Sequence, residues 1–197
     1  TPAVAMVGLL EDASKRRVQW FSADGELILL AGADRLGVHM GGSLYLKEVH
    51  GKVAGTPPPV DLAHEKRLQE FLREAASADL IASAHDLAEG GFACALAESC
   101  ISGPRGPIGA RVENPFPEAA RPDFAMFSEC QGAVLLSCAP AKRDAILDLA
   151  RRFRITMKEL GVVGGEYVDI EGLAKVGAAE LRTAWGEGFA AALGLEG

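Results

Sequence analysis

The stretch Ser83-Ala84-His85-Asp86-Leu87-Ala88-Glu89-Gly90-Gly91-Phe92-Ala93-Cys94-Ala95-Leu96 decides how this chain is expected to fold. An apolar run over residues 80–84 leads into a polar turn at 85–91, and a segment rich in Ala and Leu follows. This order is typical of a buried strand, a tight acidic loop and the start of a helix.

Two interpretations of this turn are open. Amides at a helix start can hold an anion, with His85, Gly90 and Gly91 as candidate nucleotide or phosphate contacts and Asp86 and Glu89 as candidate metal ligands. Alternatively, Asp86 caps the helix, Glu89 completes a capping box, and the glycines only permit the turn. Local pattern favours the second interpretation. His85 would suit a general base, but it would equally orient the turn through a backbone carbonyl.

A second glycine turn precedes a short helical pattern. Gly41-Gly42-Ser43 leads into Leu44-Tyr45-Leu46. Such a turn could cradle phosphate, or it could be a flexible connection in which Ser43 is the N-cap residue. No P-loop lysine pattern accompanies it, so the phosphate interpretation has little support from this turn alone.

A third polar run, Phe127-Ser128-Glu129-Cys130-Gln131-Gly132, stands immediately before the apolar segment 133–138. Ser128, Glu129 and Gln131 at a strand start could bind hydroxyl, amide or phosphate groups of a substrate. The alternative is a polar connection whose hydrogen bonds are satisfied locally, and the run taken alone favours it.

Composition narrows the functional classes. The net charge of −7 argues against wholesale binding of nucleic acid. No run is long and apolar enough to span a membrane, and no signal-peptide pattern opens the chain. The four cysteines lack the CxxC spacing of zinc sites, so a reducing, cytoplasmic setting is the simplest expectation.

The remaining periodicities predict an α+β fold, a mixed β-sheet covered by helices, because regular βαβ alternation is absent. The expected strands include a doubly buried one at 2–10, and a turn at Ala23-Asp24-Gly25 predicts a hairpin of residues 17–21 and 26–30. Residues 166–170 are expected to form the second strand of a hairpin with 155–163. Further strands and helices are expected at 109–112, 133–138, 62–76 (capped by Asp61), 141–153 and 178–193. Residues 1–197 are expected to form one domain, and the start at Thr1 suggests a piece of a longer multidomain chain.

Taken together, these motifs resemble one family. The opening run Thr1 to Asp12, Gly41-Gly42-Ser43-Leu44-Tyr45-Leu46-Lys47, the 83–91 turn and the 127–132 run occur in the order seen in the last domain of phosphoribosylformylglycinamidine synthase, synthetase subunit. The resemblance covers essentially the whole chain. It implies the C-terminal domain type of the aminoimidazole ribonucleotide (AIR) synthetase-like superfamily.

The resemblance implies a multidomain, ATP-dependent amidoligase of de novo purine synthesis. In that family ATP activates the amide oxygen of formylglycinamide ribonucleotide, and glutamine-derived ammonia displaces the phosphate to give formylglycinamidine ribonucleotide. The implied cofactors are ATP or ADP and Mg²⁺. The implied partners are the enzyme's own N-terminal nucleotide-binding domains, a glutaminase subunit and a small accessory subunit, with no nucleic acid and no membrane.

Only a few functional residues of the family have counterparts in this chain. The catalytic histidine and most nucleotide contacts of the family lie in segments absent from this chain, so no catalytic residue is assigned and the piece alone is expected to be inactive. Asp86 and Glu129-Cys130-Gln131 match the acidic metal ligand and the substrate-binding Glu-Ser-Gln run of the first C-terminal-type domain of such proteins. The chain is more similar to the second such domain, which the resemblance places beside a non-catalytic nucleotide site. Cys130, Ala88 and Ala133 depart from the pattern.

Two roles therefore stand as hypotheses. The domain contributes part of a nucleotide or phosphate site, or it is a purely structural, subunit-interface domain of the enzyme. The few basic residues near the glycine turns favour the structural role. A domain of another AIR synthetase-like enzyme is a further alternative, against which the 1–12 and 128–132 runs argue.

Overall fold

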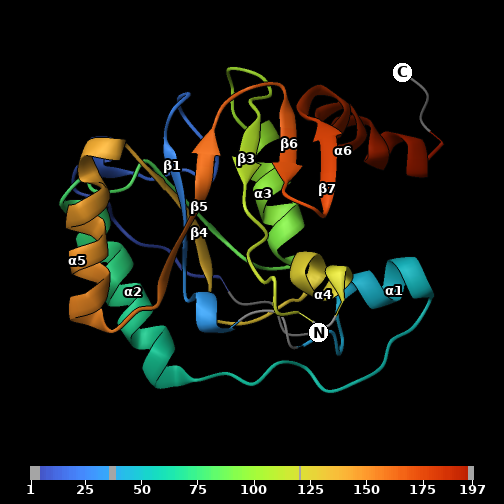
Figure 1. Cartoon of the computed structure of the whole chain (residues 1–197), viewed down its shortest axis with the longest axis horizontal. Coiled ribbons are helices and arrows are strands. Elements are labelled where there is room, and N and C mark those ends of the chain that lie inside the picture. The colour runs from blue at the N-terminus through green and yellow to red at the C-terminus, as the bar shows by residue number, and fades with distance from the viewer. Residues whose placement is uncertain (1–4, 36–38, 120, 195–197) are drawn as a thin grey trace.

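A curved mixed sheet forms the centre of the molecule (Figure 1). The computed structural model describes residues 5–35, 39–119 and 121–194. Seven described strands lie in the order β2-β4-β1-β5-β3-β6-β7. Their bounds are β1 Leu27–Ala31, β2 Ser83–Asp86, β3 Ala110–Val112, β4 Val134–Cys138, β5 Met157–Val163, β6 Tyr167–Ile170 and β7 Ala174–Gly177. The pairings are antiparallel except for β3 with β6, which is parallel.

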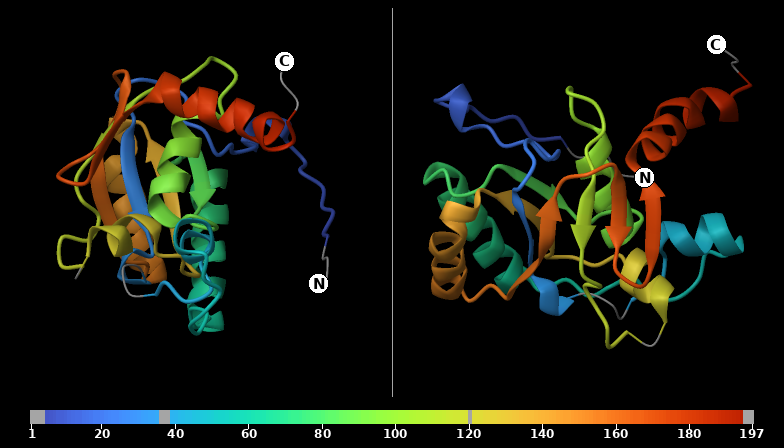
Figure 2. Two further views of the ribbon diagram at one scale, coloured as in Figure 1. Left: turned by 90° about the vertical axis from the view of Figure 1, so that its right-hand side faces the viewer. Right: turned by 45° about the horizontal axis from the view of Figure 1, so that its top comes forward.

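Helices cover both faces of the sheet. Helices α2 (Leu62–Ser77) and α5 (Arg143–Phe153) lie side by side on one face. Helices α3 (Gly91–Ile101) and α6 (Ala178–Ala192) contact each other on the opposite face (Figures 1 and 2). The shorter α1 (Leu44–His50) and α4 (Pro122–Phe127) sit at one end of the sheet, joined by stacking of the Tyr45 and Phe127 rings at 4.7 Å. Three-residue 3₁₀ turns at Ala13–Lys15, Ala33–Arg35 and Pro140–Lys142 complete the described elements.

The central strand β1 divides the core in two. Its side chains alternate, so Ile28 and Leu30 join one apolar cluster and Leu29 and Ala31 the other. The first cluster lies under α3 and includes Phe92, and the second lies under α2 and α5. A strand that is buried on both faces reads as a continuous apolar run, as this one does.

Several predicted elements are confirmed. Helix α2 follows the predicted 62–76 range, and the Asp61 carboxylate accepts the amides of Ala63 and His64 at its start. Ser43 caps α1 by accepting the amide of Leu46. The predicted strands at 109–112, 133–138 and 155–163 and the helices at 141–153 and 178–193 match β3, β4, β5, α5 and α6. The α+β class with a mixed sheet is confirmed.

The predicted N-terminal strand is wrong over its described part. Residues 5–10 form no strand, and Met6, Val7 and Leu9 are more than 90% exposed; residues 2–4 lie outside the described residues. Figure 2 shows this segment extending away from the body. These apolar side chains would be favoured in a buried position, but no part of the described chain covers them.

Two strand pairings also differ from prediction. Residues 17–21 do not pair with β1; Val18 instead bridges to Ser83 of β2, because β1 already pairs on both sides with β4 and β5. Strand β6 does not form a hairpin with β5, since β3 lies between them and β6 turns into β7, which was not predicted. The strand expected at 80–84 is shifted to Ser83–Asp86, so His85 and Asp86 belong to it. Helix α4 was also missed.

Candidate functional site

The Glu129 carboxylate joins the two glycine turns. Its Oε1 atom accepts the backbone amide of Leu44 at 2.9 Å and the backbone amide of Gly90 at 2.9 Å. Leu44 opens α1 just after the Gly41-Gly42-Ser43 turn, and Gly90 is the N-cap residue of α3. One carboxylate therefore sits at the start of both helices, where an anion is electrostatically favoured.

This arrangement settles how α3 is capped. The N-cap residue is Gly90 and not Asp86; it has a left-handed backbone (φ 78°) and no side chain, so it makes no side-chain cap bond. The predicted capping box of Asp86 and Glu89 is therefore wrong. The cap comes from Glu129, distant in sequence, which could not be found from spacing within the turn.

The 128–132 run is held at several points. The Ser128 hydroxyl, which is buried, donates to the carbonyl of His39 at 3.0 Å. At the other end, the buried His64 ring donates through Nε2 to the carbonyl of Gly132 at 2.8 Å. Ser128 and Glu129 thus make bonds within the domain, whereas Gln131 is exposed. The role of His64 was missed, and its place on the buried face of α2 is the one signal the sequence offered.

His85 and Asp86 point to different partners. The His85 Nε2 atom donates to the Glu98 carboxylate of α3 at 2.7 Å, and its side chain is only 11% exposed. His85 thereby ties β2 to α3, a positioning contact made through a side chain and not through the expected backbone carbonyl. The Asp86 carboxylate is 78% exposed and lies 3.5 Å from His85 Nδ1.

A small opening remains beside this cluster. It has a volume of about 210 Å³ and is lined by Asp86, Gln131 and Gly132, among others. Glu89 is exposed but does not line it. No group of three or more His, Cys, Asp or Glu side chains in the described part of the chain could hold a metal ion. The structure thus brings Asp86 and Gln131 to one opening, without a metal cage around them.

Two carboxylates lie near the Cys94 thiol in this cluster. Burial raises the pKa of the half-buried Cys94 thiol, and the Glu98 and Glu129 carboxylates raise it further. Burial likewise raises the pKa of Cys100 to about 12 and that of Cys138 to about 11. A negative, carboxylate-lined environment opposes an additional phosphate more than it attracts one.

These thiol environments predict slow modification of the folded chain. At pH 8, Ellman's reagent is expected to react first with Cys94, and Cys100 and Cys138 are expected to react only on unfolding. The thiolate is the nucleophile, so the Cys94 rate should rise as pH rises through its raised pKa. Glu98→Gln, which removes one carboxylate that raises that pKa, should speed the reaction about threefold. Cys94→Ser is the control, and an unchanged first phase of the reaction in this variant would contradict the assignment to Cys94.

Known proteins share much of this sequence. The family model described as AIR synthase related protein, C-terminal domain, matches residues 23–171. The PurL subunit of phosphoribosylformylglycinamidine synthase from Moorella thermoacetica is 47% identical over 165 residues, covering 84% of this chain and 22% of that protein. PurL from Anaeromyxobacter sp. (strain K) is 42% identical over 201 residues, covering 98% of this chain and 26% of that protein.

Solved structures agree in fold. Thermotoga maritima PurL complexed with FGAR superposes with a TM-score of 0.70 at 23% identity, covering 86% of this chain and 30% of that one. PurLQS from the same organism gives 0.65 at 21% identity, covering 86% and 28%. The chain therefore spans about a quarter of the length of the curated relatives it matches. It belongs to the family of AIR synthase related C-terminal domains, and its resemblance to phosphoribosylformylglycinamidine synthase is confirmed.

Proposed function

We propose that the chain serves as the C-terminal domain of a phosphoribosylformylglycinamidine synthase. The parent enzyme would be a cytoplasmic, ATP-dependent amidoligase that makes formylglycinamidine ribonucleotide from formylglycinamide ribonucleotide and glutamine-derived ammonia in purine synthesis. The sequence identity to PurL over nearly the whole chain supports this proposal. T. maritima PurL has been solved in complexes with ATP, ADP and FGAR, which supports nucleotide use by the parent enzyme.

The partners in this proposal are those that the resemblance to PurL implies. Residues 1–197 would be one domain, inactive alone, joined to N-terminal nucleotide-binding domains and assembled with a glutaminase subunit and a small accessory subunit. The exposed apolar side chains of Met6, Val7, Leu9 and Leu10 support a neighbouring domain that covers them. No described helix has the length and apolarity needed to cross a membrane.

Within that enzyme, the motif cluster is proposed to act as a structural junction and not as a phosphate site. The observation that carries this role is the Glu129 carboxylate on the amides of Leu44 and Gly90. A phosphate on Gly41, Gly42 and Ser43, or on Gly90 and Gly91, would have to displace it, and a second anion there would be repelled. His85, Ser128 and Glu129 are then positioning residues.

A second candidate role rests on the opening beside the cluster. Asp86 and Gln131 line it, and both side chains are exposed enough to meet a ligand held by a neighbouring domain. In this role Asp86, with Glu89 nearby in sequence, would add single carboxylates to a Mg²⁺ ion bound by the nucleotide of the parent enzyme. Gln131 would contact the substrate or nucleotide.

Calorimetry separates the two roles. The dissociation constant of ADP with magnesium is measured on the full-length enzyme and on its Asp86→Ala variant, with near-UV circular dichroism as the check on folding. The structural role predicts a change below about twofold, because Asp86 then touches no ligand. A loss of about tenfold or more with the fold retained would establish the metal-contact role instead. Glu166→Ala is the matched control, since it removes an exposed carboxylate immediately before β6, away from the motif cluster.

A further inference from the structure

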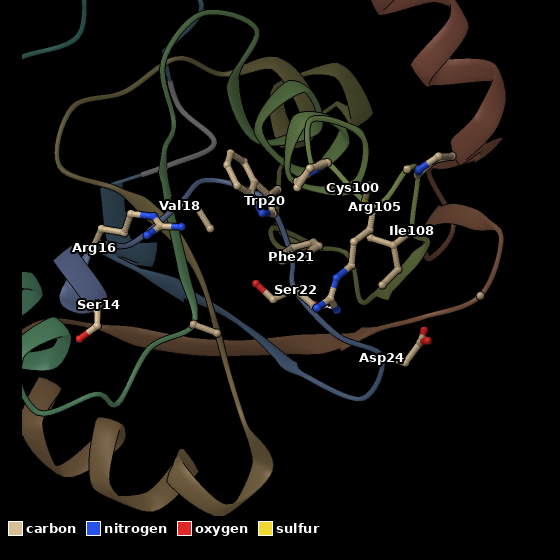
Figure 3. A pocket seen from close by; sticks show the side chains of 16 residues that line it. Ser14, Arg16, Val18, Trp20, Phe21, Ser22, Asp24, Cys100, Arg105 and Ile108 are labelled. Atoms are coloured by element: carbon tan, nitrogen blue, oxygen red, sulfur yellow. Dashed lines mark hydrogen bonds between the residues drawn. The ribbon is translucent and has the colours of Figure 1, made fainter.

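A larger cavity lies at the other end of the sheet. Because β1 and β4 are antiparallel, the 128–132 run lies at the Ala31 end of β1, while residues 14–24 approach its Leu27 end. There the 14–24 segment and the 103–108 loop line a cavity of about 640 Å³ that is half open to solvent (Figure 3). This volume is in the range of small-molecule sites, about 300–1,000 Å³. None of the motifs in the candidate site above contributes to it.

The walls of this cavity are fixed by backbone hydrogen bonds. The amide of Phe21 donates to the carbonyl of Ser99 at 2.8 Å, which holds the 14–24 segment against α3. The amide of Ile108 donates to the carbonyl of Cys100 at 2.9 Å, which holds the loop against the same helix. Both walls are therefore preformed, as small-molecule sites usually are.

Two guanidinium groups line the cavity from opposite walls. Figure 3 shows Arg105 reaching from the loop toward Ser22, and its Nη1 atom donates to the Ser22 carbonyl at 3.2 Å. Arg16 lies on the other side, beyond Val18. Among the residues that the structure describes, neither guanidinium is in an ion pair with a carboxylate. In a chain of net charge −7, this is a local positive site with free donors for an anion.

An aromatic side chain lies beside these charges. The Trp20 indole packs on Gly103, where an added Cβ would come within 3.1 Å of its Cδ1 atom, so the ring position depends on this glycine. Phe21 and Ile108 add apolar surface to the cavity. Asp24 at the rim offers an acceptor for an amino or hydroxyl group.

We propose that this cavity binds a small organic anion with a planar ring. Its phosphate or carboxylate group is held by Arg16 and Arg105, and its ring lies against Trp20. The inference does not depend on the activity of the parent enzyme, because it rests on a cavity that shares no residue with the motif cluster. Arginine recognises both kinds of anion through paired N–H donors, and ring stacking adds to either.

Fluorescence of Trp20 in the 197-residue chain tests the proposal. The chain has two tryptophans, so Trp185→Phe leaves Trp20 as the only indole reporter. Titrations use AMP, which carries ring and phosphate, anthranilate, which carries ring and carboxylate, and adenosine and ribose 5-phosphate, which each lack one feature. Saturable quenching by AMP or anthranilate is expected, with at least about fivefold weaker binding of adenosine and ribose 5-phosphate. The tighter of the first two ligands identifies the anion.

Charge variants decide whether the arginines hold the anion. Arg105→Gln, and separately Arg16→Gln, are expected to weaken binding about tenfold, since each removes a charged donor. Arg73→Gln on the exposed face of α2 makes the same change of charge and should leave binding within about twofold. Far-UV circular dichroism checks folding, and Arg105→Lys, which keeps the charge but not the paired donors, should retain part of the affinity that Arg105→Gln loses. Absence of saturable quenching by every probe, or equal affinity of Arg105→Gln and wild type, would overturn the proposal.

Discussion

Replacing Glu129 by alanine is expected to lower the free energy of unfolding by about 3 kcal/mol. The substitution removes a carboxylate that accepts two backbone amides, those of Leu44 and Gly90, and each bond to a charged group contributes about 1.5–3 kcal/mol. It also removes the favourable placement of negative charge at two helix starts. In a chain of this size the midpoint of thermal unfolding should fall by about 6–12 °C. Urea unfolding followed by circular dichroism measures the loss.

Two variants control this experiment. Glu129→Gln keeps the length and one acceptor oxygen but loses the charge, so about half of the destabilisation is expected. Glu48→Ala removes an exposed carboxylate of α1 that forms a surface ion pair with Lys47, and should change stability by less than about 0.5 kcal/mol. Equal stability of Glu129→Ala and Glu48→Ala would show that the junction does not stabilise the domain.

Gly32→Ala is expected to destabilise the fold by about 4 kcal/mol, or to prevent folding. Gly32 has a left-handed backbone (φ 74°), and a Cβ atom there would lie 2.0 Å from the carbonyl oxygen of Gly132. That oxygen is backbone and is also held by the His64 ring, so it cannot move aside cheaply. The substitution would push the end of β1 away from the 128–132 run. Thermal unfolding by calorimetry gives the expected loss.

Gly25→Ala separates the two causes of that loss. Gly25 has a similar backbone (φ 81°), but an added Cβ there would meet nothing within 4 Å. Its expected cost is therefore only the backbone term of about 1 kcal/mol. If the two alanine variants lost the same stability, the close approach of Gly32 to Gly132 would not be the cause.

Much of the fold follows from local patterns in the sequence. The amphipathic stripe of α2 with its Asp61 cap, and the continuous apolar run of β4, required no knowledge of distant contacts. Pairing was harder to predict, because a run such as 166–170 fits a strand equally well beside β5 or beside β3. The run at 5–10 has the composition of a buried strand but lies exposed, since burial depends on a partner that periodicity does not reveal.

In the candidate site, too, local features could be predicted from the sequence and long-range contacts could not. The N-cap role of Ser43, one of the two interpretations of its turn, could be predicted from position because its bond reaches only three residues along the chain. The cap of α3 comes from Glu129, separated from Gly90 by 39 residues, and no spacing rule connects the two. The three polar motifs do meet, yet they meet on a carboxylate of the chain itself. The arginine-lined cavity brings Arg16 together with Arg105, which no motif connects in sequence.

Amide resonances give the most direct test of the central claim, which is that the Glu129 carboxylate occupies the Leu44 and Gly90 amides at both glycine turns. The ¹⁵N–¹H correlation spectrum of the wild-type chain is recorded during titration with ADP and magnesium, and again for Glu129→Gln. The structure predicts that the Leu44 and Gly90 amide signals stay fixed in the wild-type titration and that both shift together on substitution of Glu129. Saturable movement of these two signals with ADP in the wild type would contradict the account and place a phosphate site at the turns.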